Sequence, residues 1–179
     1  MMDFSADFIN RAKKIKCVIF DVDGVLTDGR LFFDLSGNEY KSFHAQDGQG
    51  LKLLLQQGIE VAIISGRSSP IVDRRMNSLG IRHVYQGQEN KIAAFNDLIK
   101  KLSLDATQIA HVGDDLPDLA LMNRCGLAIA VNDANPSILP YTQWQTTRKG
   151  GSGAAREVCD AILTAQNLLT DAIQPFIDA

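Results

Sequence analysis

Short apolar runs rich in β-branched residues alternate along this chain with segments whose apolar residues recur at helical spacing. The runs have the length and the near-continuous hydrophobicity of strands that are buried on both faces of a parallel sheet. A weaker run, TQWQTT (142–147), fits a peripheral strand of the same sheet. The five predicted central strands are KCVIFDV (16–22), IEVAIIS (59–65), RHVYQ (82–86), QIAHVG (108–113) and LAIAV (127–131).

The segments between these runs predict helices. In residues 47–57, Leu51, Leu54 and Leu55 share one helical face, and Gly58 can end the helix. Such a regular alternation of strands and helices predicts an α/β fold, in which a central parallel sheet carries helices on both faces. The other predicted helices span residues 69–79, 90–102, 116–124 and 154–168.

Two regions depart from this alternation. Residues 29–44 (GRLFFDLSGNEYKSFH) contain two short β-rich pieces around SGN, which predicts a β-hairpin inserted after the first strand. Near the C-terminus, the glycines of GGSG (150–153) predict a flexible joint before the last helix, and residues 168–179 predict a flexible tail. With 179 residues and no recognisable linker, we expect a single domain over residues 1–179.

The composition narrows the class of partner. The formal net charge is −3, so there is no basic excess to bind a nucleic-acid backbone or an anionic membrane. No apolar run approaches the roughly 20 residues of a membrane span, and the N-terminus lacks the apolar core of a signal peptide. The cysteines Cys17, Cys125 and Cys159 are odd in number and far apart, which favours reduced thiols in a cytoplasmic protein over disulfides or a zinc site.

Charged and polar side chains gather where the predicted strands end. Ligands of an open α/β sheet bind beyond the carboxyl ends of its strands, so we expect these side chains to meet. Several carboxylates at such an edge repel one another, and a divalent cation with oxygen ligands, such as Mg²⁺, would offset their charge. A hydroxyl, an ammonium group and backbone N–H groups nearby suit a phosphate. With a free carboxylate as nucleophile, the set predicts phosphoryl transfer through an aspartyl-phosphate. The residues are Asp21, Asp23, Ser65, Arg67, Lys91, Asp114, Asp115 and Asp118.

The same residues carry a family resemblance. DVDGVLTD (21–28), the serine of IISGR (63–67), Lys91 and GDDLPD (113–118) resemble the four ordered motifs of the haloacid dehalogenase (HAD) superfamily. FHAQDGQGLKLL and GGSGAARE extend the likeness over nearly the whole chain, to the family of 3-deoxy-D-manno-octulosonate 8-phosphate (KDO 8-phosphate) phosphatases. The resemblance implies a Rossmann-like HAD fold. It also implies a Mg²⁺-dependent phosphomonoesterase of lipopolysaccharide biosynthesis, which converts KDO 8-phosphate to KDO and inorganic phosphate.

The resemblance further implies a role for each matched residue. Asp21 would attack phosphorus and bind Mg²⁺, while Asp23 would protonate the leaving oxygen, activate the hydrolytic water and bind the metal through its backbone carbonyl. Residues i and i+2 of an extended strand face the same way, which lets these two aspartates share a site. Asp114 would be the third metal ligand, and Ser65 and Lys91 would hold the phosphoryl oxygens. Asp115 and Asp118 would orient Lys91 and metal-bound water.

Substrate selection is expected to occur without a cap domain, because only about forty residues separate the first two motifs. The resemblance implies instead a homotetramer whose hairpins pair and whose neighbouring subunits complete each site. Basic residues at the mouth suit a substrate that carries a carboxylate as well as a phosphate. A solvated helix face is the alternative for Lys52 and Arg75, and a structural surface position is the alternative for His44. The residues implied to contact substrate are Asp23, His44, Ala45, Gln46, Asp47, Gly48, Lys52, Arg67, Arg75 and Lys91.

Other functions remain open at the level of sequence. The chain could be a HAD phosphatase for another sugar phosphate, such as a nonulosonate 9-phosphate. It could also be a non-catalytic phospho-receiver or assembly module, although a receiver has no need of an acid such as Asp23 two residues after its nucleophile. Residues 168–179 are either a frayed terminus or a tail that docks into a neighbouring active site and assists product release.

Overall fold

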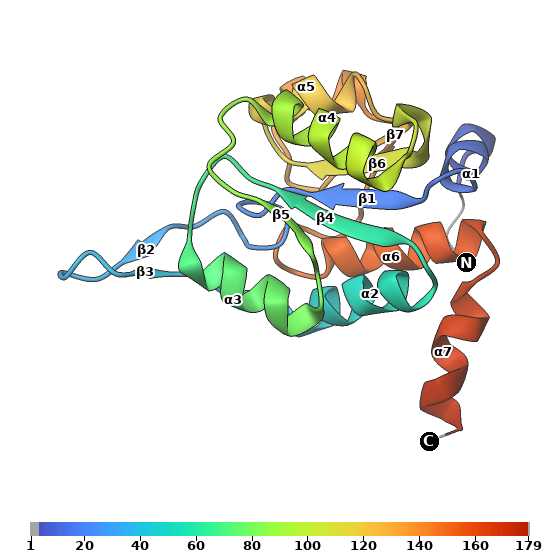
Figure 1. Ribbon diagram of the computed structural model, residues 1–179, viewed down its shortest axis with the longest axis horizontal. Coiled ribbons are helices and arrows are strands. Elements are labelled where there is room, and N and C mark those ends of the chain that lie inside the picture. The colour runs from blue at the N-terminus through green and yellow to red at the C-terminus, as the bar shows by residue number, and fades with distance from the viewer. Residues whose placement is uncertain (1–3, 179) are drawn as a thin grey trace.

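The computed structural model describes residues 4–178 and places six parallel strands in one sheet (Figure 1). The order of the strands is β5–β4–β1–β6–β7–β8, so the first strand of the chain lies at the centre. All five predicted central strands and the predicted peripheral strand are confirmed. The strands are β1 (Cys17–Phe20), β4 (Glu60–Ile64), β5 (His83–Tyr85), β6 (Ile109–Gly113), β7 (Leu127–Ala130) and β8 (Trp144–Gln145).

Helices cover both faces of this sheet, as the alternation predicts. α4 (Lys91–Leu102) and α5 (Leu119–Met122) lie over one face, and α2 (Ala45–Gln56), α3 (Pro70–Leu79) and α6 (Ala154–Ala165) lie over the other (Figure 1). The predicted helix over 116–124 consists of a 3₁₀ turn followed by α5. The remaining elements are α1 (Ala6–Ala12), α7 (Leu169–Ile177) and the 3₁₀ turns η1 (Ala106–Gln108), η2 (Leu116–Asp118) and η3 (Pro136–Tyr141).

The alternation of side chains along each strand divides the core in two. On β1, Val18 and Phe20 pack into the cluster that α2, α3 and α6 complete, whereas Cys17 and Ile19 pack into the cluster that α4 completes. All four residues of β1 are buried. This explains the unbroken apolar run in the sequence, because a strand with helices on both faces has no solvated side.

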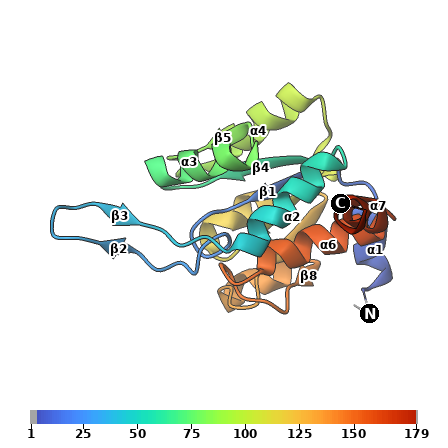
Figure 2. The same ribbon diagram turned by 90° about the horizontal axis from the view of Figure 1, so that it is seen from below.

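A two-stranded antiparallel ribbon extends from the body of the molecule (Figures 1 and 2). It comprises β2 (Phe32–Phe33) and β3 (Glu39–Tyr40), with Phe32 opposite Tyr40, and agrees with the predicted hairpin over 29–44. The Asp34 carboxylate accepts hydrogen bonds from the backbone N–H groups of Ser36 and Asn38, which forms the turn. The residues described contain no cap domain over the end of the sheet.

The C-terminal residues differ from the expectation of a flexible tail. Residues Leu169–Ile177 form α7, which leaves the body of the molecule after α6 (Figure 1). Ala172 is buried, while Phe176 and Ile177 are exposed. Ala179, the last residue of the predicted tail, lies outside the described residues. From residue 4 to residue 178, no helix has the length and apolar character needed to cross a membrane.

Candidate active site

A cleft of about 290 Å³ opens where the carboxyl ends of the central strands meet. Asp21 directly follows β1, Ser65 follows β4 and Asp114 follows β6, so parallel pairing brings three distant motifs to one edge of the sheet. The sequence predicted this meeting of strand ends. The cleft is lined by Asp21, Asp23, Ser65, Gly66, Arg67, Lys91, Asp114, Asp115 and Pro117.

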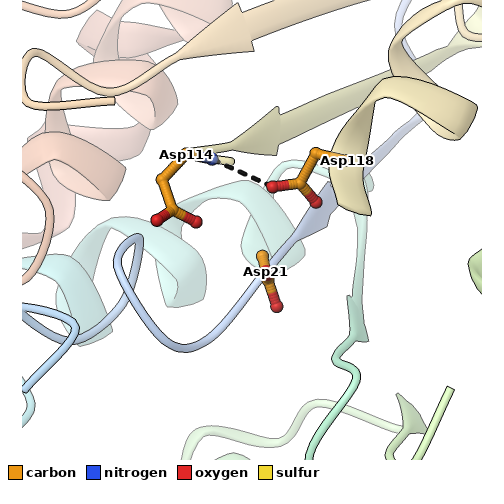
Figure 3. Close-up of side chains that lie close together, drawn as sticks. All are labelled: Asp21, Asp114 and Asp118. Carbon is orange, nitrogen blue, oxygen red and sulfur yellow. Dashed lines mark hydrogen bonds between the residues drawn. The ribbon is translucent and has the colours of Figure 1, made fainter. Parts of the chain in front are cut away.

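Three carboxylates form the acidic centre of the cleft (Figure 3). Asp21, Asp114 and Asp118 each offer an oxygen, and these atoms lie within 4.8 Å of one another. Asp118 is completely buried, and its Oδ2 accepts hydrogen bonds from the backbone N–H groups of Asp114 (3.0 Å) and Asp115 (3.3 Å). Its Oδ1 lies 2.7 Å from Lys91 Nζ, which leaves no unused oxygen on this carboxylate.

His111 also contacts Asp118, a link that the sequence did not indicate. His111 is fully buried on β6, and its Nε2 lies 2.9 Å from Asp118 Oδ1. The sequence suggested only a core position for this histidine, because it lies within an apolar strand pattern. Burial alone raises the pKa of Asp118, but the hydrogen bonds from His111 and Lys91 and their charges lower it below its ordinary value. Asp118 is therefore held as a carboxylate.

Lys91 reaches the cleft because α4 begins at this residue. The Asn90 side chain caps the helix by accepting a hydrogen bond from the backbone N–H of Ile92. The Lys91 side chain is 1% exposed, and its Nζ lies 2.9 Å from Asp21 Oδ2 as well as 2.7 Å from Asp118 Oδ1. Burial alone lowers the pKa of Lys91, yet the two carboxylates together raise it above its ordinary value. The lysine thus stays charged between two acids.

The other two carboxylates carry unfavourable charge in the metal-free chain. Burial, followed by the charges of Asp118, Asp21 and Asp115, raises the pKa of Asp114 to about 8. Burial and the Asp118 charge also raise the pKa of Asp21, although Lys91 opposes this. Within residues 4–178 the Asp114 carboxylate accepts no hydrogen bond. Free, repelling oxygens of this kind fit a hard divalent cation.

Glycines give Asp114 its space. Gly24 has φ +91°, and a Cβ built there would lie 2.1 Å from Asp114 Oδ2. Gly150 packs against the Gly24 backbone, because its own Cβ would lie 1.7 Å from the Gly24 carbonyl oxygen. Gly151 donates its N–H to the Val25 carbonyl. The GGSG segment is therefore a packed support for the loop after β1, which corrects the expectation of a flexible joint.

The hairpin contributes two residues that the sequence did not indicate. Lys41, just after β3, contacts Asp23 Oδ1, and its Nζ lies 3.3 Å from Glu39 Oε1. Arg67 joins the same group, with Nη2 2.8 Å from Glu39 Oε1 and Nε 3.6 Å from Asp23 Oδ2. We call Lys41, Asp23, Glu39 and Arg67 the hairpin cluster. The i, i+2 spacing of Glu39 and Lys41 was the available signal, but it does not show where the hairpin root folds.

The predicted substrate-binding residues do not all lie in one place. Arg67 lines the acidic cleft. His44, Asp47, Gly48 and Arg75 line a separate small pocket between α2 and α3, and Lys52 lies on another part of the surface.

Asp47 has a partner that the sequence did not suggest. Its buried carboxylate accepts hydrogen bonds from the backbone N–H groups of Gly153 (3.3 Å) and Arg156 (2.8 Å), at the start of α6. This carboxylate therefore caps the start of α6.

Comparisons with known proteins identify related phosphatases. A family model described as haloacid dehalogenase-like hydrolase matches residues 81–158. The 3-deoxy-D-manno-octulosonate 8-phosphate phosphatase KdsC of Escherichia coli (strain K12) is 48% identical over 168 residues, which cover 94% of this chain and 89% of that protein. The 3-deoxy-D-manno-octulosonate 8-phosphate phosphatase of Yersinia pestis has a crystal structure with a TM-score of 0.91 and 45% identity, covering 92% of this chain and 89% of that one.

A further similar structure contains ligands. The 3-deoxy-D-manno-octulosonate 8-phosphate phosphatase of Moraxella catarrhalis was crystallised in complex with a magnesium ion, a phosphate ion and a KDO molecule. It has a TM-score of 0.92 and 45% sequence identity to this chain, and the match covers 95% of this chain and 98% of that one.

Proposed function

The chain belongs to the family of 3-deoxy-D-manno-octulosonate 8-phosphate phosphatases, within the haloacid dehalogenase-like hydrolases, and we propose that it hydrolyses KDO 8-phosphate to KDO and inorganic phosphate. The observation that carries this proposal is the convergence of Asp21, Ser65, Lys91 and Asp114 on one cleft at the strand ends. The reaction belongs to lipopolysaccharide biosynthesis. We propose a cytoplasmic location, which suits the three free thiols Cys17, Cys125 and Cys159.

Asp21 is the nucleophile of this proposal. Its Oδ1 accepts a hydrogen bond from the Val22 N–H (2.7 Å) and its Oδ2 contacts Lys91, which together fix the carboxylate at the edge of the cleft. A carboxylate oxygen attacks phosphorus, and the bond between phosphorus and the C8 oxygen of the sugar breaks. The phosphoryl group is then carried on Asp21 as an aspartyl-phosphate.

Asp23 moves the protons in both steps. It gives a proton to the C8 oxygen as that oxygen leaves, and then takes one from the water that attacks the aspartyl-phosphate. The attack breaks the bond between phosphorus and the Asp21 oxygen, so inorganic phosphate leaves and Asp21 is restored. Asp23 lines the same cleft as Asp21, as this division of roles requires.

Ser65 and Lys91 bind the phosphoryl oxygens. Ser65 is buried at the end of β4. Its backbone N–H donates a hydrogen bond to the Tyr85 carbonyl, so the hydroxyl is the group of this residue left to bind a phosphoryl oxygen. Lys91 brings a fixed positive charge to within 2.9 Å of the nucleophile. Such a charge is worth more in a cleft that excludes water than in solution.

The donor set fits Mg²⁺. Asp21, Asp114 and the backbone carbonyl of Asp23 would hold the ion, and Gly24 leaves the Asp114 carboxylate room to do so. When bound, the ion would neutralise charge on the phosphoryl oxygens and offset the repulsion between the carboxylates. Asp118 has both oxygens occupied, so we propose that it orients Lys91, while Asp115 orients metal-bound water.

We also propose that a homotetramer completes the substrate site. Arg67 lines the cleft of its own chain, whereas residues 44–48, Lys52 and Arg75 lie outside that cleft. Contacts from these residues to the sugar acid would therefore come most directly from a neighbouring subunit. The hairpin is a suitable contact surface, because it exposes five large apolar side chains to solvent. These are Leu31, Phe32, Phe33, Leu35 and Tyr40.

The activity is tested by phosphate release with Mg²⁺ across a panel of sugar phosphates, with Asp21→Asn as the matched variant. We expect KDO 8-phosphate to exceed nonulosonate 9-phosphates and simple hexose phosphates, and the variant to lose activity with all of them. Broad, weak activity that still needs Asp21 would leave the chemistry in place and contradict the substrate. Equal inactivity of both proteins would favour a non-catalytic module.

The assembly is tested by sedimentation of the wild-type chain and of a Phe32→Glu, Phe33→Glu double variant. We expect a tetramer for the wild type. In the variant, charges in the contact surface should yield smaller species with a higher KM for KDO 8-phosphate. A monomeric wild type with full activity would contradict this part of the proposal.

A further inference from the structure

We propose that Lys41 is a positioning residue, which holds one oxygen of Asp23 and thereby decides which oxygen exchanges protons during catalysis. The inference deepens the function proposed above and rests on it, because it takes Asp23 as the acid and base of the reaction. Lys41 lies on the hairpin, outside every motif that suggested the function.

The Lys41 ammonium group is buried against Asp23, which lines the cleft. Its side chain is only 1% exposed, although the residue lies at the root of a solvent-exposed hairpin. A buried ammonium group needs partners that offset the loss of hydration, and Asp23 Oδ1 and Glu39 Oε1 supply them. The position of Lys41 is therefore strongly determined, and so is the carboxylate oxygen that it contacts.

The two oxygens of Asp23 are not equivalent. Oδ1 contacts Lys41, whereas Oδ2 is buried and has no hydrogen-bond partner among residues 4–178. Arg67 Nε lies 3.6 Å from Oδ2, beyond hydrogen-bond distance. A buried carboxylate oxygen without a donor is available to a hydroxyl group or a water molecule. Oδ2 is therefore the atom that gives a proton to the C8 oxygen and takes one from water.

Glu39 links the two cations of the hairpin cluster. Its Oε1 contacts both Lys41 (3.3 Å) and Arg67 (2.8 Å), so the hairpin cluster holds two cations and two carboxylates. Loss of Lys41 would leave Asp23 free to turn toward Arg67. Oδ1 and Oδ2 would then share the guanidinium, and the free oxygen would be lost.

The test compares Lys41→Met with wild type on two substrates that differ in their need for a proton. The C8 alkoxide of KDO is a poor leaving group without one, whereas the p-nitrophenolate of p-nitrophenyl phosphate leaves unprotonated. Because kcat/KM reports only the steps up to loss of the first product, it isolates leaving-group departure. We expect kcat/KM for KDO 8-phosphate to fall about 100-fold and that for p-nitrophenyl phosphate to stay near the wild-type value.

Three further variants make the result specific. Asp23→Asn should show the same selective loss, because Lys41 acts through Asp23. Lys41→Gln keeps a hydrogen-bond donor without the charge and should recover part of the lost rate, which also provides a folded variant if Lys41→Met unfolds. Lys101→Met removes a lysine whose Nζ lies 2.7 Å from Asp97 at the far end of α4, and should leave both substrates unchanged.

Several outcomes would overturn the inference. Equal losses on both substrates in a folded Lys41 variant would assign Lys41 a structural role only, and no loss on either would remove it from the reaction. Failure of the proposed function gives a different result, since Asp21→Asn would then retain whatever activity the wild type has.

Discussion

Two buried lysines reach the carboxyl end of the sheet, and each meets an aspartate in a different condition. Lys91 and Lys41 both have side chains that are 1% exposed. Asp118, beside Lys91, has hydrogen-bond partners on both oxygens, including two backbone N–H groups. Among the residues that the structure describes, Asp23, beside Lys41, has a hydrogen-bond partner on one oxygen only. Asp118 therefore has no oxygen left for a ligand, whereas Asp23 has one free oxygen.

This difference distinguishes a carboxylate that holds a neighbour in place from one that can react. A carboxylate with four hydrogen bonds cannot exchange protons without losing some of them, so Asp118 is suited to hold Lys91 in place. A carboxylate with one oxygen fixed and the other free is oriented and still reactive. Asp114 is also a reactive carboxylate, because its side chain accepts no hydrogen bond within the described residues and has a raised pKa. Counting partners on each oxygen thus distinguishes acids that share one cleft.

The largest expected effect is on stability and compares the two lysines directly. Lys91→Met leaves Asp118 and Asp21 buried without their cation, and we expect it to lower the free energy of unfolding by about 3–5 kcal/mol. Lys41→Met should cost clearly less, because the Asp23 side chain is 19% exposed and Arg67 lies nearby. Urea denaturation of the metal-free proteins measures both values. Equal losses would contradict the distinction between the two pairs.

The next effect concerns the space around the free carboxylate of Asp114. Gly150→Ala places a methyl group against the Gly24 carbonyl and should displace the Gly24 backbone, which packs against the Asp114 carboxylate. We expect Mg²⁺ affinity, measured by calorimetry, to fall roughly 10- to 100-fold. Gly126→Ala is the matched control, because its Cβ would lie 2.1 Å from the Thr107 carbonyl at the opposite end of the sheet. If both variants lose stability but keep metal affinity, the glycine support has no part in the site.

A smaller effect tests whether Asp118 needs every one of its partners. His111→Phe removes one donor from a buried carboxylate that keeps Lys91, and we expect a loss of about 1–3 kcal/mol in unfolding free energy together with reduced kcat. His83→Phe is the control on β5, at the edge of the sheet, where the imidazole lies 3.8 Å from the half-exposed Glu60. It should cost less than about 1 kcal/mol. Indistinguishable variants would show that His111 is only a core residue.

The sequence predicted the strand ends better than the residues that support them. Asp21, Ser65 and Asp114 were predictable because each follows an apolar strand, and parallel topology brings such ends together. Lys41 was missed because the spacing of residues within a hairpin does not show where its root packs. The capping role of Asp47 was missed because its partners, at the start of α6, are more than one hundred residues away. Long-range support of this kind leaves no local periodicity to detect.

The last prediction uses the pH dependence of the free carboxylate. Asp114 has a pKa of about 8 in the metal-free protein, against an ordinary value of 3.8. Between these values the folded chain binds more protons than the unfolded chain, so metal-free stability should fall as the pH rises from about 4 to 8. Mg²⁺ binding must displace the same proton. The Asp114 proton alone should therefore make the affinity rise by up to about tenfold per pH unit below pH 8 and level off above it.

Asp118 is expected to show no such pH dependence. Its pKa is already below the ordinary value, so it is ionised across this range and should contribute no slope. Calorimetry at pH 6, 7 and 8, in buffers with different ionisation enthalpies, would measure the number of protons released. We expect up to about one from Asp114, with a further contribution from Asp21, whose pKa is also raised. Binding without proton release would mean that Asp21 and Asp114 are both ionised before the metal binds. Repulsion among the carboxylates would then not control their protonation.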